Sequence, residues 1–244
     1  ELEEHGCELV RVAVPNTKAA KAIPAIKRGI SIPLIADIHF DYRLALMALE
    51  AGVDGLRLNP GNISDPEKVS TIVQAAKERN VPIRIGVNAG SLPKSTNHRL
   101  TVAQRMVDAA LQQIKLLESL DFDLIKVSLK AFDVPTTIEA YQDIAQKIPY
   151  PLHIGITESG TPRTGIIRST VGISTLLYLG IGDTIRVSLT AHPREEVIAA
   201  YEILKSLNLR QHGPILVSCP SCGRCEIDII KLAEEVEERL LKID

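Results

Sequence analysis

Short apolar runs recur along the chain, and stretches with the helical spacing of apolar residues separate them. The runs are nearly continuous rather than alternating, which is typical of parallel strands covered on both faces. They predict strands at residues 9–14, 33–37, 55–59, 82–88, 124–129, 152–157, 184–189 and 215–218. The amphipathic stretches predict helices that include residues 42–51, 65–79, 102–119, 136–146 and 195–207. This repetition indicates an α/β fold, either an open doubly wound sheet or a (β/α)8 TIM barrel.

Polar residues near the ends of these runs distinguish the two folds. Four predicted strands carry a pair of polar side chains two or four residues apart, so both members of a pair share one face. A barrel gathers all its strand ends around one mouth, whereas an open sheet gathers only those beside its switch point. Four such strands therefore favour the barrel. The pairs are Arg57 with Asn59, Arg84 with Asn88, Lys126 with Ser128, and Arg186 with Ser188.

The last predicted strand, at residues 215–218, leads directly into a cysteine motif instead of a helix. We therefore expect seven barrel strands plus the first strand of another domain, with the missing first barrel strand lying before Glu1. The stretch 208–214, which contains Gly213 and Pro214, is the best domain boundary. This predicts an incomplete TIM-barrel domain at 1–212 and the beginning of a small α+β domain at 213–244.

Composition and charge exclude several classes of function. The chain has 244 residues, a net charge of −2 and a sequence pI near 6.4, which argues against a general nucleic-acid or membrane-surface binder. No apolar run reaches the roughly 18–20 residues of a membrane span. The first residues carry no secretory signal, so we expect a cytoplasmic protein. Any anion-binding site must then be a local concentration of cations.

Five cations lie in or beside predicted strands, and we call this set the cationic cup. A charge inside a strand is costly unless it is paired or solvated at a mouth. Some of these cations could pair with barrel acids, but their convergence with Asn59, Asn88 and Ser188 indicates a phosphate or diphosphate site. Turns at 60–62 and 88–91 could add backbone N–H donors. The members of the cationic cup are Arg11, Arg57, Arg84, Lys126 and Arg186.

Two acids stand at predicted strand ends. Asp37 shares a face with His39, and the pair is suited to orient a substrate or relay protons. Asp41, just beyond them, is expected to cap the helix that begins at Tyr42. Glu158 lies among the cations and is a candidate general acid or base. Its alternative role is a helix N-cap or an ion pair with an arginine.

Three of the four cysteines form the motif Cys219-x-x-Cys222-x-x-Cys225. Without a secretory signal, this spacing indicates a metal or cluster site rather than disulfides. It favours a [4Fe–4S] cluster, although a fourth ligand is not visible. Zinc, with His212 as a weak fourth ligand, and a redox dithiol stay open. Cys7 is alone in an apolar stretch, as expected for a small buried side chain.

Several longer segments occur in an order that a known family shares: LVRVAVP, IADIHFDYRLAL, GLRLNPGNI, RIGVNAGSL, IKVSLKA, LHIGITESG, GIGDTIRVSLT and CPSCGR. Together they resemble the bacterial-type 4-hydroxy-3-methylbut-2-enyl diphosphate synthases over nearly the whole chain. The resemblance implies a TIM barrel followed by a small iron–sulfur domain. It also implies reductive ring opening and dehydroxylation of 2-C-methyl-D-erythritol 2,4-cyclodiphosphate in the non-mevalonate isoprenoid pathway. The expected electron donor is flavodoxin or ferredoxin, and the expected assembly is a homodimer.

The resemblance also implies roles for single residues. The cationic cup would hold the diphosphate with help from Asn88 and Ser188, next to Asp37 and Asn59. Glu158 would be the acid near the departing oxygen, and Cys219 and Cys222 would bind the [4Fe–4S] cluster. The family's remaining cluster ligands belong to a later segment that this sequence does not contain. We therefore expect the polypeptide alone to be inactive, and the role of Cys225 stays open.

Two other functions remain as alternatives. One is a pterin-binding-like barrel transferase, which would have no cluster and would leave the cysteine motif without a role. The other is a non-catalytic diphosphate-binding barrel with a zinc knuckle.

Overall fold

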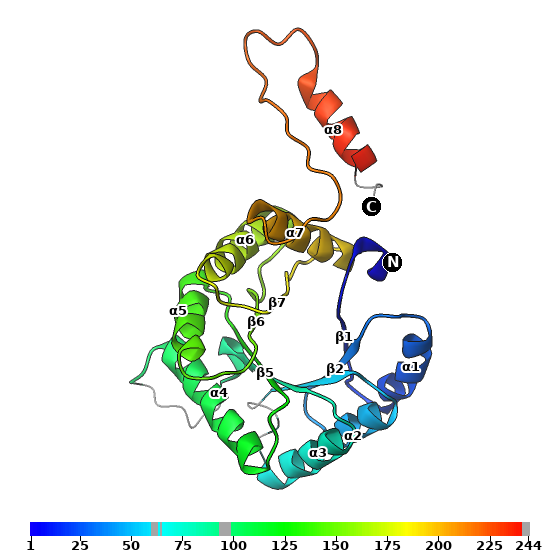
Figure 1. Cartoon of the computed structure of the whole chain (residues 1–244), viewed down its shortest axis with the longest axis vertical. Coiled ribbons are helices and arrows are strands. Elements are labelled where there is room, and N and C mark those ends of the chain that lie inside the picture. The colour runs from blue at the N-terminus through cyan, green and yellow to red at the C-terminus, as the bar shows by residue number, and fades with distance from the viewer. Residues whose placement is uncertain (60–62, 64, 93–98, 241–244) are drawn as a thin grey trace.

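The computed structural model describes residues 1–59, 63, 65–92 and 99–240, in which strands and helices alternate (Figure 1). The strands are β1 (Val10–Ala13), β2 (Leu34–Ile38), β3 (Gly55–Leu58), β4 (Ile83–Asn88), β5 (Ile125–Lys130), β6 (His153–Ile154) and β7 (Thr184–Ile185). The helices are α1 (Thr17–Arg28), α2 (Tyr42–Glu50), α3 (Pro66–Glu78), α4 (Val102–Ser119), α5 (Val134–Ala145), α6 (Pro162–Tyr178), α7 (Pro193–Ser206) and α8 (Ile229–Leu240). Two short 3₁₀ helices, η1 (Glu3–His5) and η2 (Ala89–Ser91), complete the described elements.

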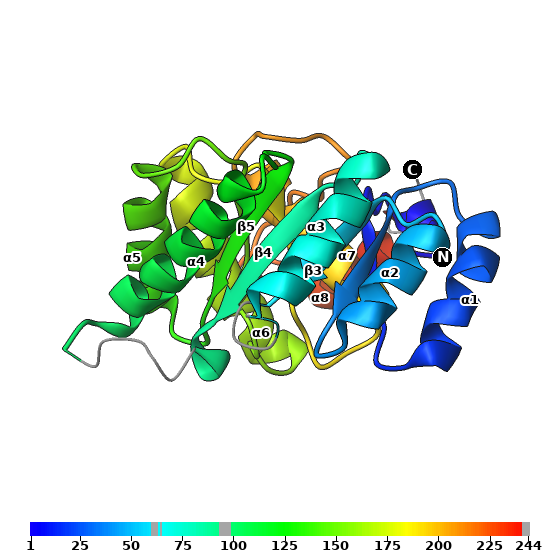
Figure 2. The same ribbon diagram turned by 90° about the horizontal axis from the view of Figure 1, so that it is seen from below.

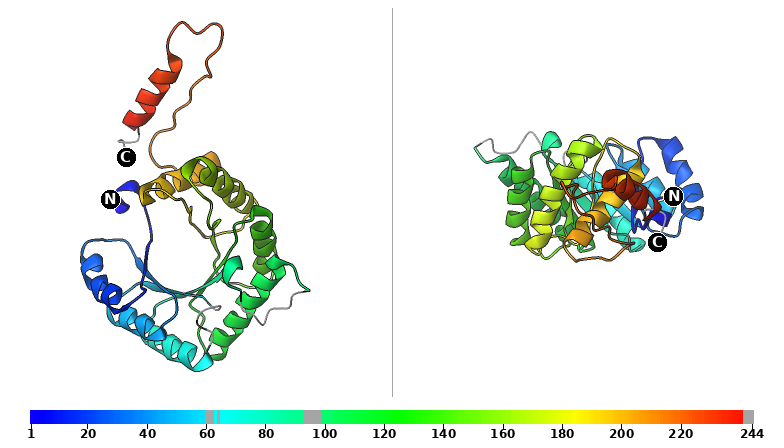
Figure 3. Two further views of the ribbon diagram at one scale, coloured as in Figure 1. Left: turned by 180° about the vertical axis from the view of Figure 1, so that it is seen from behind. Right: turned by 90° about the horizontal axis from the view of Figure 1, so that it is seen from above.

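The strands form a wall that follows the order of the chain. Strands β1 to β5 make one parallel sheet in sequence order, β6 and β7 pair in parallel, and an isolated bridge from Val127 to Leu152 joins the two parts. Helices α1 to α7 surround this wall (Figures 1 and 3). Within the described residues β1 and β7 do not pair. The fold is therefore a (β/α) barrel that lacks one strand, which confirms the predicted fold class.

The N-terminal segment lies across the opening between β1 and β7. The hydroxyl of Tyr201 on α7 donates a hydrogen bond of 2.7 Å to the carbonyl oxygen of Gly6. The ring of Tyr201 also stacks on His212, with ring centroids 4.1 Å apart. These contacts hold the chain ahead of β1 against the last helix of the barrel.

The two faces of the strands differ sharply in polarity. Helix-facing residues such as Ile83, Ile85 and Val87 are buried under the helices, which lie across the outer face of the sheet (Figure 2). The alternate positions, such as Arg84, point into the barrel, because side chains alternate along a strand. A TIM barrel usually fills its interior with branched apolar side chains. In this barrel the apolar core lies between sheet and helices, and the interior holds several charged side chains among apolar ones.

Short polar residues begin several helices. The carboxylate of Asp41 accepts a hydrogen bond from the backbone N–H of Arg43, which confirms its predicted role as the N-cap of α2. Asp65 and Asp133 cap α3 and α5 in the same way, and Thr101 forms a capping box with Gln104 at the start of α4. These caps fix where each helix leaves the mouth of the barrel.

The predicted strand at residues 215–218 is wrong. This segment is extended but pairs with no described strand, and Val217 is 90% exposed. A β-strand needs a neighbour to satisfy its backbone groups, and none lies beside this segment. Helix α8 follows and stands away from the barrel (Figures 1 and 3). An iron–sulfur domain is not visible in the described residues, and the division at residue 212 stays a prediction.

Candidate active site

Three cations occupy one row across the barrel wall. Arg57 on β3 is paired in register with Arg84 on β4, which is paired with Lys126 on β5. Neighbouring strands lie only about 4.8 Å apart, so these cations repel one another unless negative charge lies beside them. The β-ladder thus brings together residues that the sequence separates by 27 positions (Arg57 and Arg84) and by 42 positions (Arg84 and Lys126).

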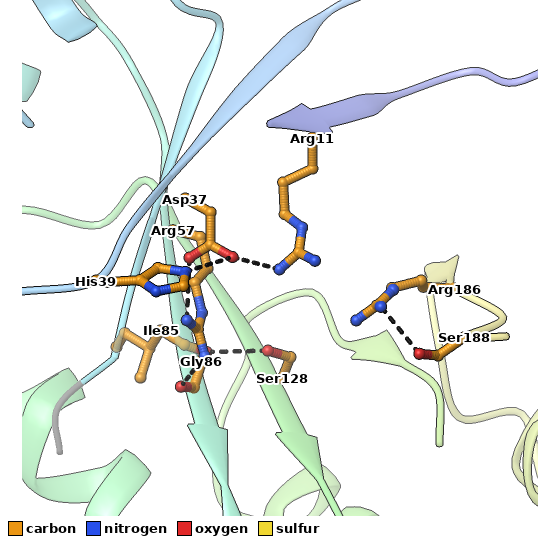
Figure 4. Close-up of polar contacts among 9 residues, drawn as sticks. All are labelled: Arg11, Asp37, His39, Arg57, Ile85, Gly86, Ser128, Arg186 and Ser188. Carbon is orange, nitrogen blue, oxygen red and sulfur yellow. Dashed lines mark hydrogen bonds and ion pairs between the residues drawn. The ribbon is translucent and has the colours of Figure 1, made fainter. Parts of the chain in front are cut away.

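Asp37 supplies the negative charge at one end of this row. It is paired in register with Arg57, and its carboxylate accepts hydrogen bonds from Arg57 Nη1 at 3.0 Å and from Arg11 Nη1 at 2.5 Å (Figure 4). His39 Nε2 lies 3.7 Å from the same carboxylate. Burial alone would raise the pKa of Asp37, but the charges of Arg57 and Arg11 lower it below its ordinary value. Asp37 is therefore ionised at neutral pH and orients both guanidinium groups.

A glycine in β4 makes room for Arg57. The guanidinium Nη2 of Arg57 donates to the carbonyl oxygen of Gly86 at 3.0 Å. A Cβ atom at residue 86 would lie 2.4 Å from Arg57 Nε. Glycine at this strand position thus allows an arginine side chain to cross the backbone, a familiar reason for glycine inside a strand.

Arg84 is the most isolated member of the cationic cup. Its Nε is buried and has no hydrogen-bond partner among the described residues. Burial, followed by repulsion from Arg11 and Arg57, lowers the pKa of Arg84 to about 9. The group is still protonated at neutral pH. An unpaired donor on a buried cation is the kind of group that an anion would satisfy.

Lys130 is a sixth cation that the sequence analysis missed. It lies at the end of β5, in register with Asn88, and is only 4% exposed. Burial, reinforced by Arg84 and Arg186, lowers its pKa well below the ordinary value. The two-residue period of Lys126 and Ser128 continues to Lys130, and this period was the signal that could have identified it.

His153 is a second missed residue. It lies on β6, and its Nδ1 is 2.9 Å from the hydroxyl of Thr184 on β7. Burial, reinforced by Lys130 and Arg84, lowers the pKa of His153 well below its ordinary value. It is therefore neutral at pH 7 and adds no further positive charge.

The remaining polar residues of the predicted site come from separate strands and loops. Arg186 donates from Nη2 to the hydroxyl of Ser188 at 3.0 Å (Figure 4). The side-chain amide of Asn59 donates to Ser91 Oγ at 2.9 Å. Asn88 ends β4. The predicted turn at 60–62 lies outside the described residues.

A cavity of about 790 Å³ connects the barrel interior with the opening between β1 and β7. This volume is within the range of small-molecule sites. Figure 4 shows Arg11 entering the interior from β1 and Arg186 from the segment after β7, with Asp37 and Arg57 across from Arg186. Four members of the cationic cup line the cavity, Arg11, Arg84, Lys126 and Arg186, and Arg210 lines it as well.

Glu158 lies apart from the cationic cup. Its side chain is exposed, and no ion pair to it is found in the part of the chain that the structure describes. Its backbone has a φ of 56°, in the left-handed region. The other described non-glycine residues with positive φ are Asn or Asp, which tolerate this conformation better. Strain of this kind often marks a functional position. Glu158 is also not the N-cap of α6, because Thr161 holds that position.

The cysteine motif does not form a complete metal site by itself. Cys219 and Cys222 are exposed, and Cys225 donates from its thiol to the carbonyl oxygen of Ile227. Within the described ranges, no three Cys, His, Asp or Glu side chains converge on one point. His212 stacks on Tyr201 instead of joining the cysteines. The motif thus offers two exposed thiols from one turn, which is only part of a cluster's ligand set.

The fold and the site together define a class: a (β/α) barrel whose interior gathers several cations around one carboxylate. The model of the GcpE TIM-barrel domain family matches residues 1–201. The 4-hydroxy-3-methylbut-2-en-1-yl diphosphate synthase (flavodoxin) of Dehalococcoides mccartyi is 70% identical over 244 residues, which is all of this chain and 70% of that protein. The synthase of the same name from Geobacter sulfurreducens is 61% identical over 98% of this chain and 68% of its own length. The chain belongs to this synthase family.

Solved structures show the same fold at low sequence identity. The dihydropteroate synthase of Yersinia pestis matches with a TM-score of 0.59 at 11% identity, over 85% of each chain. The HMG-CoA lyase of Brucella melitensis matches with a TM-score of 0.58 at 14% identity, over 85% of this chain and 82% of that one. At such low identity, these structural matches show a shared barrel fold and nothing about function. In addition, no helix within the described residues is long and apolar enough to cross a membrane.

Proposed function

We propose that this chain provides the substrate-binding barrel of a 4-hydroxy-3-methylbut-2-en-1-yl diphosphate synthase. The substrate is 2-C-methyl-D-erythritol 2,4-cyclodiphosphate, and the reaction opens its ring reductively and removes a hydroxyl group. Membership in the synthase family supports this assignment. The observation that carries it is the cationic cup, whose five cations come from β1, β3, β4, β5 and the segment after β7, and four of them line one cavity.

The diphosphate is bound by the cations that Asp37 leaves unpaired. Arg84 has a buried Nε without a partner, and Lys130 is buried among positive charges, so both gain from a phosphate oxygen. Asp37 already satisfies one N–H each of Arg11 and Arg57 and aims the rest of each guanidinium. Arg186 and Ser188 face this group from the opposite wall. Asn59, Asn88 and Lys126 complete the binding residues.

Glu158 is the proposed acid for the departing hydroxyl. The bond from carbon to this hydroxyl breaks, and the oxygen leaves as water after it has accepted a proton. A carboxyl group at the mouth, outside the ion pairs of the cationic cup, is free to supply that proton. The left-handed backbone at Glu158 supports a functional rather than a structural role.

Cys219 and Cys222 are the proposed ligands that this chain contributes to a [4Fe–4S] cluster, with the other ligands coming from outside this motif. When bound, the cluster would deliver the two electrons of the reaction, received from flavodoxin or ferredoxin. The relatives' names specify flavodoxin. The proposal also includes a homodimer that works in the cytoplasm.

The two alternative functions, a pterin-binding-like transferase and a diphosphate-binding barrel with a zinc knuckle, have less support. The likeness to dihydropteroate synthase rests on 11% identity and carries no inference about a pterin substrate. A zinc knuckle needs four converging ligands, and the described residues bring together fewer than three.

Calorimetric titration of the chain with the cyclic diphosphate tests the binding half of the proposal. We expect saturable binding, weakened at least about tenfold in Arg84→Met, because a charge-assisted hydrogen bond contributes roughly 1.5–3 kcal/mol. Arg79→Met, which removes an exposed arginine at the end of α3, is the matched control and should bind like the wild type. Absence of binding, or equal weakening in both variants, would contradict the proposal.

The chemical half requires a polypeptide of the relatives' length that contains this chain. After anaerobic reconstitution with iron and sulfide, we expect a brown protein that turns over the cyclic diphosphate. Cys219→Ser should lose the colour and the turnover, whereas Glu158→Gln should keep the colour and lose the turnover. A colourless protein with stoichiometric zinc would support the zinc-knuckle alternative instead.

A further inference from the structure

The chain leaves β6 through a turn that changes which side chains are buried. Ile154 and Ile156 are buried on the helix-facing side, where Ile156 packs against Gly172 of α6. Regular alternation would send Glu158 to the same buried side. The left-handed φ of 56° at Glu158 reverses this order, so its side chain is exposed and that of Ser159 is fully buried. The turn thus keeps a carboxylate accessible at the end of a barrel strand.

Contacts on the two residues that follow Glu158 hold this turn. They are needed because a left-handed backbone costs free energy in a residue with a Cβ atom. The buried hydroxyl of Ser169 donates to Ser159 Oγ at 3.3 Å. The backbone N–H of Thr190 donates to the carbonyl oxygen of Gly160 at 2.9 Å. The carbonyl oxygen of Ser159, which lies between these two points, has a third partner.

That partner is Arg168 on α6, which joins the turn to the neighbouring loop. Its Nη1 donates to the carbonyl oxygen of Ser159 at 2.8 Å. Its guanidinium also lies over the ring of Phe132, with Cζ 4.8 Å from the ring centroid, in a cation–π contact. One half-buried side chain therefore holds the turn after β6 and the loop after β5 at the same time.

Phe132 connects this contact to the strand that carries Lys130. It lies two residues after Lys130, in the loop that follows β5. In the same loop, the carbonyl oxygen of Ala131 accepts a hydrogen bond of 3.2 Å from the backbone N–H of Thr157. The ends of β5 and β6 are thus joined twice, once through the backbone and once through Arg168. These contacts fix the diphosphate-binding end of β5 relative to the turn after β6.

We propose that Arg168 is a positioning residue for the acid step, because it holds the turn that keeps the Glu158 carboxylate at the mouth of the barrel. This inference rests on the proposed role of Glu158 and adds a second residue to it. Arg168 acts through the turn rather than on the substrate, since Ser159 and Phe132 already engage its guanidinium. Without it, the turn would relax toward the right-handed backbone that a glutamate prefers and would move the carboxylate. A displacement of about 1 Å can cost roughly 100-fold in rate.

Kinetics of a synthase of the relatives' length that contains this chain, reconstituted with iron and sulfide, test this role. Arg168→Met should lower kcat by about 10–100-fold and leave KM and the calorimetric affinity for the cyclic diphosphate within about twofold, because it displaces the acid and keeps the cationic cup. Arg168→Lys should stay within about threefold of the wild-type kcat, since an ammonium group still donates to the carbonyl and lies over the ring. Arg163→Met removes an exposed arginine from the first turn of the same helix and should behave like the wild type.

Limited proteolysis of the chain itself measures the turn without any chemistry. A glutamate-specific protease cleaves after Glu158 only when the surrounding backbone opens, so the cleavage rate reports how firmly the turn is held. Arg168→Met should be cleaved there at least about tenfold faster than the wild type or Arg163→Met. Cleavage after Glu78, at the end of α3 on a distant part of the barrel wall, should be equal in all three proteins and shows that the fold is intact.

The outcomes separate this inference from the proposed function. Equal kcat and equal cleavage after Glu158 in Arg168→Met and the wild type would overturn the positioning role and leave the acid assignment standing. A loss of substrate affinity that accounts for the whole loss of rate would overturn it as well, because Arg168 would then act on binding. Full turnover in Glu158→Gln would overturn the proposed acid, and faster cleavage in Arg168→Met would then report a structural contact only.

Discussion

Lys126 and Lys130 share one face of β5, yet they meet different surroundings. Lys126 is half-buried beside Arg84, whereas Lys130 is enclosed among Arg84, Arg186, Arg11 and Arg57, and no acid among the described residues forms an ion pair with it. A buried ammonium without a counter-charge destabilises the empty protein. It is tolerated when a ligand supplies the missing charge. Replacing Lys130 therefore tests the proposed anion site more directly than replacing Lys126 does.

Replacing these lysines should separate their effect on the stability of the empty protein from their effect on diphosphate binding. Lys130→Met should raise the free energy of unfolding of the empty protein by about 1–3 kcal/mol, because it removes an unpaired buried charge. It should also weaken the binding of inorganic diphosphate by roughly 10–100-fold. Lys126→Met is the control and should change both quantities less. Urea unfolding and calorimetry measure the two effects, and a larger loss of affinity in Lys126→Met would contradict this assignment.

Asp37 should make stability depend on acid pH. Its pKa in the folded state is below the ordinary 3.8, so its contribution is complete above the unfolded-state value and is lost as pH falls through the folded-state value. Asp37→Asn should cost about 3–5 kcal/mol at pH 7, since it leaves Arg11 and Arg57 unpaired. Wild-type stability should therefore fall below about pH 4, where the variant's curve should be flatter.

Urea unfolding at several pH values measures this dependence. Asp41→Asn removes an exposed carboxylate that caps α2 and pairs with Arg43, and it serves as the control. It should cost less at pH 7 than Asp37→Asn. Parallel pH curves for the wild type and Asp37→Asn would show that another group governs the acid transition.

The sequence predicts a residue of the site where a charged side chain falls within an apolar run that is predicted to be a strand. Arg57, Arg84 and Lys126 follow from cations in apolar runs, and the register then joins them. The two-residue period of β5 points to Lys130, whereas no local signal distinguishes His153, and the burial of both side chains depends on strands far away in the sequence. The roles of Glu158, Cys219 and Cys222 stay predictions, since no contact in the described chain joins them to the cationic cup.

At the scale of elements, the sequence predicts which segments are helices and strands better than where they end. Helices α5 and α7 begin earlier than predicted, since Pro135 and Pro193 occupy their first turns, where proline is compatible with a helix. Strands β6 and β7 are shorter than predicted, because β7 has no described neighbour on its other side. Residues 215–218 have strand composition without a partner. Strand pairing depends on which segments the fold brings side by side, so local composition alone cannot predict it.

The contact between β6 and β7 should be sensitive to one glycine. A Cβ atom at Gly155 would lie 2.3 Å from the carbonyl oxygen of Arg186. Gly155→Ala should therefore cost about 1–3 kcal/mol and displace Arg186, which lowers diphosphate affinity as well. Gly90→Ala, where a Cβ meets nothing within 4 Å, is the matched control and should change stability by less than about 0.5 kcal/mol. Equal unfolding curves for the two variants would contradict the close approach.

At the scale of the whole molecule, the distribution of charge matters more than its sum. The chain has a net charge of −2, yet its barrel gathers the cationic cup and Lys130 around Asp37, the one buried carboxylate in the part of the chain that the structure describes. The remaining surface is correspondingly acidic. A small polyanion is therefore attracted to the interior and repelled elsewhere, a distribution that favours a specific site over general anion binding. The net charge alone could not reveal this separation.

This separation predicts that a diphosphate stabilises the empty barrel far more than salt does. At 100 times its dissociation constant, a ligand that binds only the folded state adds about 2.7 kcal/mol. For a chain of this size that corresponds to a rise in melting temperature of roughly 5–10 °C. Inorganic diphosphate should produce this rise in thermal unfolding, whereas sodium chloride at equal ionic strength should not. The effect should fall by at least about half in Arg84→Met, because that variant lacks the buried donor. An equal rise with chloride would show that the cationic cup responds only to general charge screening.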